Sequence, residues 1–181
     1  MSSASITRVL WKQARAGDRA AYDRLFALHV DHLLMFIRVR LGAGLAARVD
    51  PEDVLQETYL SAHRSFDQFD YVEDGAFLRW LCRIAENRLR DSHDRFAAGK
   101  RQAVEVPRSS PTGPVSAFAR IEDRARVEQA LQQLEPDHRL VLLHRYFEGL
   151  SAEDTAERME RTSGAVRKLA ARALVELGKL L

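Results

Sequence analysis

A single stretch rich in proline, glycine and serine divides this sequence into two parts. Residues 97–118, AAGKRQAVEVPRSSPTGPVSAF, contain Pro107, Pro111, Pro114 and Gly113 and have no helical periodicity. A segment of this length without regular structure is uncommon inside a compact domain, so it predicts a flexible linker. We therefore expect a first domain over residues 1–96, a linker over 97–118 and a second domain over 119–181.

Both predicted domains have the patterns of helices. Apolar residues make up 46% of the chain and charged residues 30%, which is enough apolar material for a core. Runs that alternate Val, Ile and Thr with polar residues, as strands do, are missing. The fold class that we predict is all-α, with two small helical domains. About four helices are expected in the first domain, and residues 20–41 read as one long helix ended by Gly42 and Gly44.

The cellular location is predicted from cysteine usage and from the apolar runs. Cys82 is the only cysteine, so the chain has no internal disulfide, which favours the cytoplasm. The N-terminal stretch lacks the uninterrupted apolar segment of a signal peptide, and no run approaches the roughly 18 apolar residues of a membrane span. We expect a cytoplasmic protein that does not contact a membrane.

Residues 49–60, VDPEDVLQETYL, form a predicted helix that carries four acids and no Lys or Arg, although the chain has a net charge of +2. Asp50 is a suitable N-cap, Pro51 suits the first helical position, and Asp53 falls at the capping-box position. A buried stripe is expected on one side of this helix, at Leu55, Tyr59, Ala62 and Phe66.

A second face of the same helix combines acids, an amide and a leucine. Asp53, Gln56, Glu57 and Leu60 follow the i, i+3, i+4, i+7 spacing that brings side chains together. Acids in a first turn favour the helix dipole, which explains Asp53 but not Gln56 or Glu57. This face predicts a docking surface for a basic protein partner, and it would repel DNA.

The next segment combines predicted exposed aromatics with a basic helix. A helix through residues 76–95 is expected to bury Phe77, Trp80, Leu81, Ile84 and Leu89 and to present a polar side that includes Arg83, Asn87 and Arg90. Phe69 and Tyr71 precede it in a loop-like stretch, FDQFDYVEDG. Exposed aromatics beside such a helix suit stacking on unpaired bases. Packing of both rings within the loop is an alternative that the sequence leaves open.

The second domain contains the pattern of a helix-turn-helix. Ser151 with Asp154 predicts a capping box, the helix that follows ends near Met159, and Thr162 or Ser163 caps a long final helix after a tight turn. In this motif the second helix enters the DNA major groove. Five basic residues and one acid lie between Arg161 and the C-terminus. The candidate DNA contacts are Arg161, Ala165, Arg167, Lys168 and Arg172, and a solvated basic face is the alternative.

Four motifs in this order resemble the extracytoplasmic-function (ECF) group of bacterial RNA polymerase sigma factors. They are DPEDVLQETYLSAHRSFDQF, FLRWLCRIAENRLRD, LEPDHRLVLLHRYFEGLS and GAVRKLAARALVEL. The resemblance implies that the first domain (region 2) binds the clamp helices of the polymerase β′ subunit and captures the minus-ten promoter element. The second (region 4) then reads the minus-thirty-five element, and the linker threads toward the active-site channel.

The resemblance also assigns roles to individual residues. It implies that Asp53, Gln56 and Glu57, with Leu60 on the same face, bind the polymerase. It places the following residues where the family melts and reads the minus-ten strand: Asn87, Arg88, Asp91 and Arg95. An anti-sigma factor is a further partner that the family implies. Neither a cofactor nor a metal is implied, and no residue is expected to be catalytic.

Two departures from the family pattern concern the helix-turn-helix. Glu160 stands where the family usually has a small residue, often Gly, and Arg161 stands in a slot that is usually apolar. The common Thr-Val-Lys-Ser-Arg run of the recognition helix is replaced by residues 165–169, AVRKL. These changes leave the predicted fold in place but prevent any promoter sequence from being transferred to this chain.

Two other classes of function fit the sequence less well. A stand-alone helix-turn-helix regulator would leave the acidic 50–57 face without a role. An enzyme is disfavoured because the sequence has no phosphate-binding glycine loop and no convergent polar set. His29 and His32 lie three apart, but no third ligand joins them at a recognisable spacing. The prediction is therefore a sigma factor, whose promoters and activating signal the sequence does not reveal.

Overall fold

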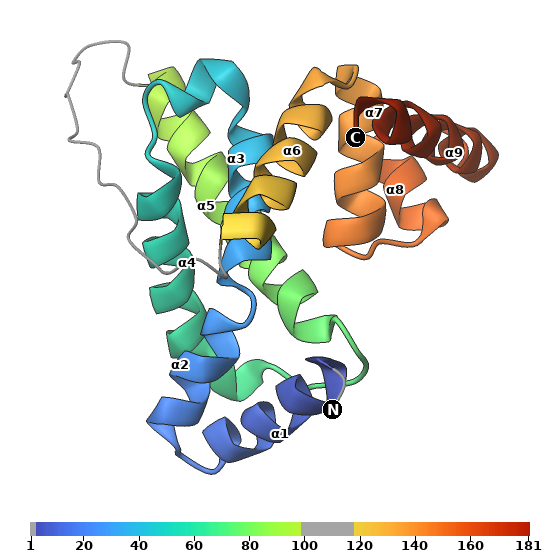
Figure 1. Ribbon diagram of the computed structural model, residues 1–181. Helices are drawn as coiled ribbons and strands as arrows, with labels where there is room; N and C mark the ends of the chain where they lie inside the picture. The colour runs from blue at the N-terminus through green and yellow to red at the C-terminus, as the bar shows by residue number, and fades with distance from the viewer. Residues whose placement is uncertain (1–2, 99–117) are drawn as a thin grey trace. The chain divides into compact units, whose positions relative to one another are not determined.

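The computed structural model describes residues 3–98 and 118–181, with side chains described at 6–42, 47–91 and 125–181. The chain divides into two compact units, Met1–Asp94 and Arg95–Leu181. Within the described ranges every regular element is helical and no strand occurs, so the all-α prediction is confirmed (Figure 1). Most of the predicted 97–118 linker lies outside the described residues, and the predicted domain limits stay predictions.

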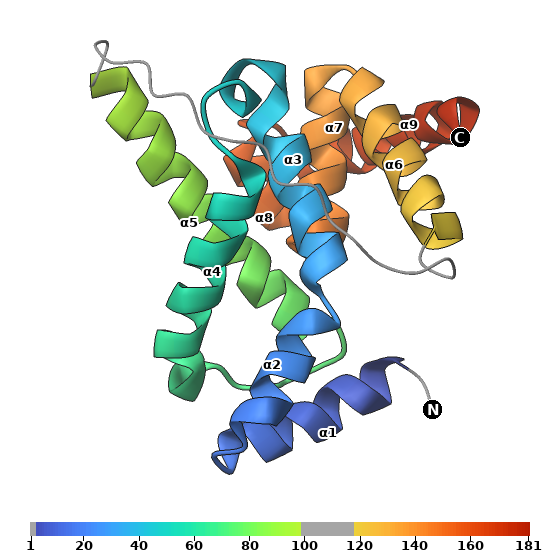
Figure 2. The ribbon, with the colours of Figure 1, turned by 60° about the vertical axis from the view of Figure 1, so that its left-hand side comes forward.

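Unit 1 is a bundle of helices. Its elements are α1 (Ser3–Arg15), α2 (Arg19–Ala27), α3 (Val30–Ala46), α4 (Pro51–Ser65), the short 3-10 helix η1 (Phe66–Gln68) and α5 (Ala76–Ala98). Helix α1 packs against α2, and α3 packs against α4. In both views α1 runs at a steep angle to α3 and α4 (Figures 1 and 2).

The single helix predicted over residues 20–41 is wrong, because the chain forms α2 and α3 there. Helix α2 is capped by Asp18, whose carboxylate accepts a hydrogen bond from the Ala21 amide at 3.0 Å. It ends at Ala27, and a short turn at Leu28 and His29 leads into α3. Neither Gly nor Pro marks this turn, and the apolar pattern continues through it, so the sequence signal for a break was missing.

The end of α3 has the predicted glycine break. Gly42 has φ +58° and ψ 174°, which is not helical. Glycine adopts such an angle without a Cβ clash, so the regular part of the helix stops at this position as expected.

The core of unit 1 is aromatic and aliphatic. Its largest fully buried side chains are Leu25, Leu33, Phe36, Ile37, Phe77 and Leu81. The buried stripe of α4 differs from the prediction, since Val54 and Thr58 are buried with Ala62 whereas Leu55 and Tyr59 are half-buried. The Thr58 hydroxyl donates to the Val54 carbonyl at 2.7 Å, which satisfies it inside the core. The prediction is thus confirmed at Ala62 and Phe66, and it is wrong at Leu55 and Tyr59, where the neighbouring Val54 and Thr58 are the buried residues.

His29 gives unit 1 a pH-dependent stability. Its ring lies 5.4 Å from that of Phe77, and burial, with a smaller effect of His32, lowers the pKa of His29 from 6.5 to about 4. The folded state therefore favours neutral His29, while the unfolded chain protonates it below pH 6.5. We expect the free energy of unfolding to fall as the pH is lowered from about 6.5 toward 4.

Replacing this ring with an aliphatic side chain checks that expectation. The His29 Nε2 atom is buried without a hydrogen-bond partner in the described residues, so His29→Leu leaves no polar group unsatisfied. Urea unfolding at pH 7 and pH 5 should show a smaller loss of stability for His29→Leu than for the parent chain. An equal loss in both proteins would show that other groups cause the dependence.

Unit 2 is a smaller helical domain. Its elements are α6 (Phe118–Gln133), α7 (Pro136–Leu142), the π-helical turn η2 (Leu143–Phe147), α8 (Ala152–Arg158) and α9 (Ser163–Leu180). Helix α9 packs against both α7 and α8. The inner face of α9 consists of Val166, Ala170 and Ala173, which are buried, while Leu169 and Leu177 are half-buried.

Candidate protein-docking and nucleic-acid interfaces

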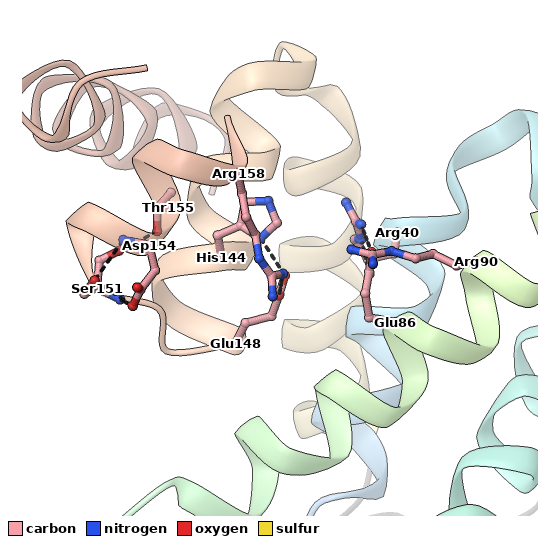
Figure 3. A network of polar contacts seen from close by, with 9 residues as sticks. All are labelled: Arg40, Glu86, Arg90, His144, Glu148, Ser151, Asp154, Thr155 and Arg158. Atoms are coloured by element: carbon pink, nitrogen blue, oxygen red, sulfur yellow. Dashed lines mark hydrogen bonds and ion pairs between the residues drawn. The ribbon is translucent and has the colours of Figure 1, made fainter. Parts of the chain in front are cut away.

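Helices α8 and α9 begin at the predicted caps. The Ser151 hydroxyl accepts the Asp154 amide at 2.9 Å, and the Asp154 carboxylate accepts the Ser151 amide at 3.3 Å, which makes the predicted capping box (Figure 3). The Ser151 hydroxyl also donates to the Asp154 carboxylate at 2.7 Å, and this bond, with the one from the Ser151 amide, holds the pKa of Asp154 below its ordinary value. Helix α9 is capped by Thr162, whose hydroxyl accepts the Ala165 amide at 3.2 Å. The start of each helix of the helix-turn-helix is thus set by local hydrogen bonds.

The turn between the two helices contains a strained residue. The Arg161 amide donates to the Ala156 carbonyl at 2.9 Å and the Glu160 amide to the Glu157 carbonyl at 3.3 Å, the paired bonds of a Schellman motif. Glu160 has φ +53°, the only positive φ of a residue other than glycine in the described ranges. This is the position where the family usually has a small residue, and the geometry gives the physical reason.

Glu160→Gly should stabilise unit 2. A residue with a Cβ in the left-handed region costs on the order of 1 kcal/mol, and glycine removes most of that strain. We expect a gain of about 0.5 kcal/mol in the free energy of unfolding, measured by denaturant titration, after the larger chain entropy of glycine is offset. Glu160→Ala keeps the Cβ and is the matched control. Equal stabilities of the Gly and Ala variants would contradict the assignment.

A buried carboxylate links the turn η2 to helix α8. Glu148 is 1% exposed and accepts hydrogen bonds from Arg158 at 2.7 Å, and its other oxygen lies 2.7 Å from His144 Nδ1 (Figure 3). A buried charge requires such partners, because its desolvation is otherwise uncompensated. Glu148 therefore orients α8 within unit 2. No sequence pattern indicated this role, although Glu148 lies shortly before the predicted helix and Arg158 lies at its end.

The candidate DNA contacts of unit 2 are mostly exposed. Arg167, Lys168, Arg172 and Arg161 are exposed, and Ala165 is half-buried. Arg161 donates to Asp137, and Arg167 donates to Glu153 at 2.7 Å. In the part of the chain that the structure describes, neither Lys168 nor Arg172 forms an ion pair. We call the exposed side chains of Arg161, Arg167, Lys168 and Arg172 the cationic stripe, and two of its arginines are paired within the unit.

The four residues of the predicted docking face are all exposed on α4. They are Asp53, Gln56, Glu57 and Leu60, and Leu60 is 51% exposed. Among the described residues, neither Asp53 nor Glu57 forms an ion pair. We call these four residues the acidic face. Because these four side chains are exposed, a partner protein could reach all of them.

The two other acids of this stretch have structural roles. Asp50 caps α4 by accepting the Glu52 amide at 2.9 Å, and hydrogen bonding with Glu52 holds the pKa of Asp50 below its ordinary value. Glu52 in turn accepts a hydrogen bond from Arg38 of α3 at 2.8 Å. Both acids are therefore used within unit 1, which separates them from the acidic face.

The predicted exposure of Phe69 and Tyr71 is wrong, since they are 6% and 9% exposed. Phe69 stacks on Trp80 with ring centroids 4.8 Å apart. Tyr71 lies against Trp11 and Arg8 of α1 and donates to Asp74 at 2.9 Å. Trp11 and Arg8 belong to helix α1, which was not among the predicted helices, and they cover part of the Tyr71 ring. Both rings are therefore packed and not exposed to solvent, which is the alternative that the sequence left open.

The polar side of α5 is partly exposed. Arg83, Asn87 and Asp91 are exposed, whereas Arg88 is half-buried and lies 3.4 Å from Asp91. Arg95 falls in the last part of α5, where side chains lie outside the described residues. Asn87 is thus a predicted contact to the minus-ten strand, and its side chain is exposed in the structure.

A second buried carboxylate fixes the position of α5. Glu86 is 4% exposed and binds Arg40 of α3 through both oxygens, with the Arg40 Nε bond at 2.7 Å (Figure 3). Arg90, one turn further along α5, lies 3.6 Å from the same carboxylate. The ion pair joins α3 to α5 and so holds the helix that carries Asn87. Because Arg40 and Glu86 are 46 positions apart, no local pattern in the sequence predicts the pair.

Two searches of the described residues concern other kinds of site. No group of three or more His, Cys, Asp or Glu side chains in the described residues is placed to hold a metal ion. None of the helices in the same part of the chain has the length and apolar character needed to cross a bilayer.

Unit 2 thus has a capped helix-turn-helix with exposed cations, and unit 1 has an exposed acidic face on α4. The sequence model of Sigma-70 region 2 matches residues 25–97, and that of Sigma-70 region 4 matches residues 124–177. These matches cover the acidic face and all but the last residue of α5 in unit 1, and they cover α8 and α9 as far as residue 177 in unit 2.

Curated relatives and a solved structure agree with these matches. The chain is 33% identical to the ECF RNA polymerase sigma factor SigM of Mycobacterium tuberculosis, over 92% of this chain and 80% of the relative. It is 33% identical to the RNA polymerase sigma-H factor of Pseudomonas aeruginosa, over 95% and 92%. The structure of CnrH in complex with the cytosolic domain of CnrY is 28% identical, covers 97% of this chain and 96% of CnrH, and has a TM-score of 0.53.

The chain belongs to the ECF family of RNA polymerase sigma factors. Its function is accordingly that of a transcription initiation factor in promoter recognition, and the stand-alone regulator is not favoured. Sigma factors act by binding and not by catalysis.

Proposed function

We propose that this chain binds core RNA polymerase through the acidic face of α4 and brings the enzyme to a defined set of promoters. The observation that carries the proposal is the joint exposure of Asp53, Gln56, Glu57 and Leu60 on one helix. An exposed apolar side chain among acids fits a basic protein surface that also offers an apolar contact. The clamp helices of the β′ subunit are the proposed partner, and the cytoplasm is the proposed location.

The two units have different proposed roles on the promoter. Unit 1, with residues 1–96 as its proposed domain, captures the minus-ten element through the polar side of α5, where Asn87 is exposed. Unit 2, with residues 119–181 as its proposed domain, contacts the minus-thirty-five element through α9. An asparagine can hydrogen-bond the edge of an unpaired base, and exposed Lys and Arg can bind phosphates.

An anti-sigma factor is a further proposed partner. Support comes from CnrH, which was solved with a second protein, the cytosolic domain of CnrY. A protein that covers the acidic face would prevent polymerase binding, and its release would free the face. Competition between such a protein and core polymerase for the chain would test this role.

Lys168→Ala and Arg172→Ala test the DNA-binding role of unit 2. Both side chains are exposed on α9 and form no ion pair within the described residues, so their loss should leave the fold intact. Each variant should lower the affinity of the holoenzyme for a promoter fragment by about five- to tenfold and reduce the salt dependence of binding. Filter binding at several KCl concentrations measures both quantities.

Lys179→Ala is the matched control for these variants. Lys179 is also exposed on α9 but lies in its last turn, two turns beyond Arg172. It should change promoter affinity much less than Lys168→Ala or Arg172→Ala. Equal effects of all three variants would show a general charge effect and would contradict the assigned stripe.

A further inference from the structure

Two cations of the proposed DNA-binding stripe are paired with acids of the same unit. The Arg167 Nη2 atom of α9 donates to Glu153 Oε1 of α8 at 2.7 Å, and the two side chains are 61% and 64% exposed. Arg161, in the turn, donates to Asp137 of α7, with 42% and 51% exposure. Both pairs therefore lie at the surface of unit 2, and in each pair the arginine belongs to the helix-turn-helix.

Exposed ion pairs of this kind are weak, because water screens the charges and the side chains lose freedom when they pair. A DNA phosphate or a guanine edge can therefore take the arginine from its acid. The exchange breaks one favourable contact and leaves an unpaired carboxylate close to a polyanion. Net affinity for DNA is then lower than the number of cations on the surface suggests.

We propose that Glu153 and Asp137 are counter-charges that hold the DNA affinity of unit 2 below the value its own cations would give. This inference rests on the proposed function, since it takes the α9 stripe as the DNA-binding surface. A unit that binds DNA weakly by itself depends on being tethered to the polymerase through unit 1, which raises its effective concentration at the promoter. The acids would thus couple upstream-element binding to polymerase docking.

Glu153→Gln compared with Glu157→Gln tests the first counter-charge. Both substitutions remove one negative charge from the exposed surface of α8, but Glu157 forms no ion pair within the described residues. In holoenzyme assembled from the full chain and core polymerase, Glu153→Gln should bind a labelled promoter fragment about two- to fivefold more tightly. The salt dependence of its binding should also be steeper, by up to about one released ion. Glu157→Gln should change both quantities less.

Asp137→Asn provides a second comparison. Its control is Glu135→Gln, because Glu135 is exposed at the N-cap of α7 and its side chain makes no capping hydrogen bond. Asp137→Asn should raise promoter affinity by a similar factor, and the two gains should combine in the double variant because the pairs share no residue.

A variant cycle with Arg167 separates pairing from general electrostatics. In an Arg167→Gln background, Glu153→Gln should give a clearly smaller gain, since only the repulsion between the carboxylate and DNA is then removed. A gain of undiminished size in this background, a gain of equal size in Glu157→Gln, or no gain in the parent background would overturn the proposal. Lys168→Ala reports on the proposed function separately. If it lowers affinity while Glu153→Gln has no effect, only the counter-charge role fails.

Discussion

Replacing both Asp53 and Glu57 with lysine should lower the affinity of the chain for core RNA polymerase by about 100-fold or more. Both carboxylates are exposed on α4 and form no ion pair within the described residues, so they are available to a basic partner. Reversal converts attraction into repulsion, and like charges placed together in an interface cost several kcal/mol. About 2.8 kcal/mol corresponds to a 100-fold change in the dissociation constant.

The fold should tolerate this change. Neither side chain contributes to the core, and the loss of a favourable charge near the helix N-terminus at Asp53 costs about 0.3–1 kcal/mol. Circular dichroism and a thermal scan check the fold, and fluorescence anisotropy with labelled chain and purified core polymerase measures the affinity.

The control for this variant carries the same charge change elsewhere on unit 1. Asp67 and Asp70 are both exposed and lie outside the acidic face, so their double replacement by lysine should leave polymerase affinity within a fewfold of the parent chain. Unchanged affinity of the Asp53/Glu57 variant, or an equal loss in the Asp67/Asp70 variant, would refute the docking face.

Glu148→Ala should destabilise unit 2 by about 1–3 kcal/mol, because it leaves the buried His144 ring without its partner and removes the contact with Arg158. The carboxylate is 1% exposed and bonds to both residues at 2.7 Å. Since Glu148 joins the turn η2 to α8, its loss should also disorder the helix-turn-helix. Urea unfolding followed by circular dichroism measures the stability, and promoter binding by the holoenzyme reports on the helix-turn-helix.

Two further variants define the cause of that loss. Glu157→Ala removes a carboxylate from α8 that is exposed, and it should cost less than about 0.5 kcal/mol. Glu148→Gln keeps an acceptor and nearly the same volume, so it should destabilise less than Glu148→Ala. A cost below about 1 kcal/mol for Glu148→Ala would mean that the ion pair does not hold unit 2 together.

Local patterns in the sequence predicted the parts of the fold that depend on neighbouring residues. The caps at Asp50, Ser151 and Thr162 and the break at Gly42 are each set by side chains or angles within a few positions. The exposed acidic face followed in the same way from helical spacing. These features could be predicted because their physical causes lie within one or two turns of chain.

The features that the sequence did not predict depend on distant residues. Burial of Tyr71 requires α1, which lies about sixty positions earlier, and the Arg40–Glu86 pair joins helices 46 positions apart. The turn between α2 and α3 has no Gly or Pro to mark it. Pairing of Arg161 and Arg167 with acids was also missed, since it requires α7, α8 and α9 to be in place. Tertiary packing, and not local preference, decides each of these.

Run-off transcription tests the central claim most directly. Purified core polymerase would transcribe a fragmented library of the source genome, with and without this chain, and with the Asp53/Glu57 lysine variant. We expect discrete new transcripts that require the parent chain and are absent with the variant. A chain that fails to co-elute with core polymerase and yields no new transcript would contradict the account.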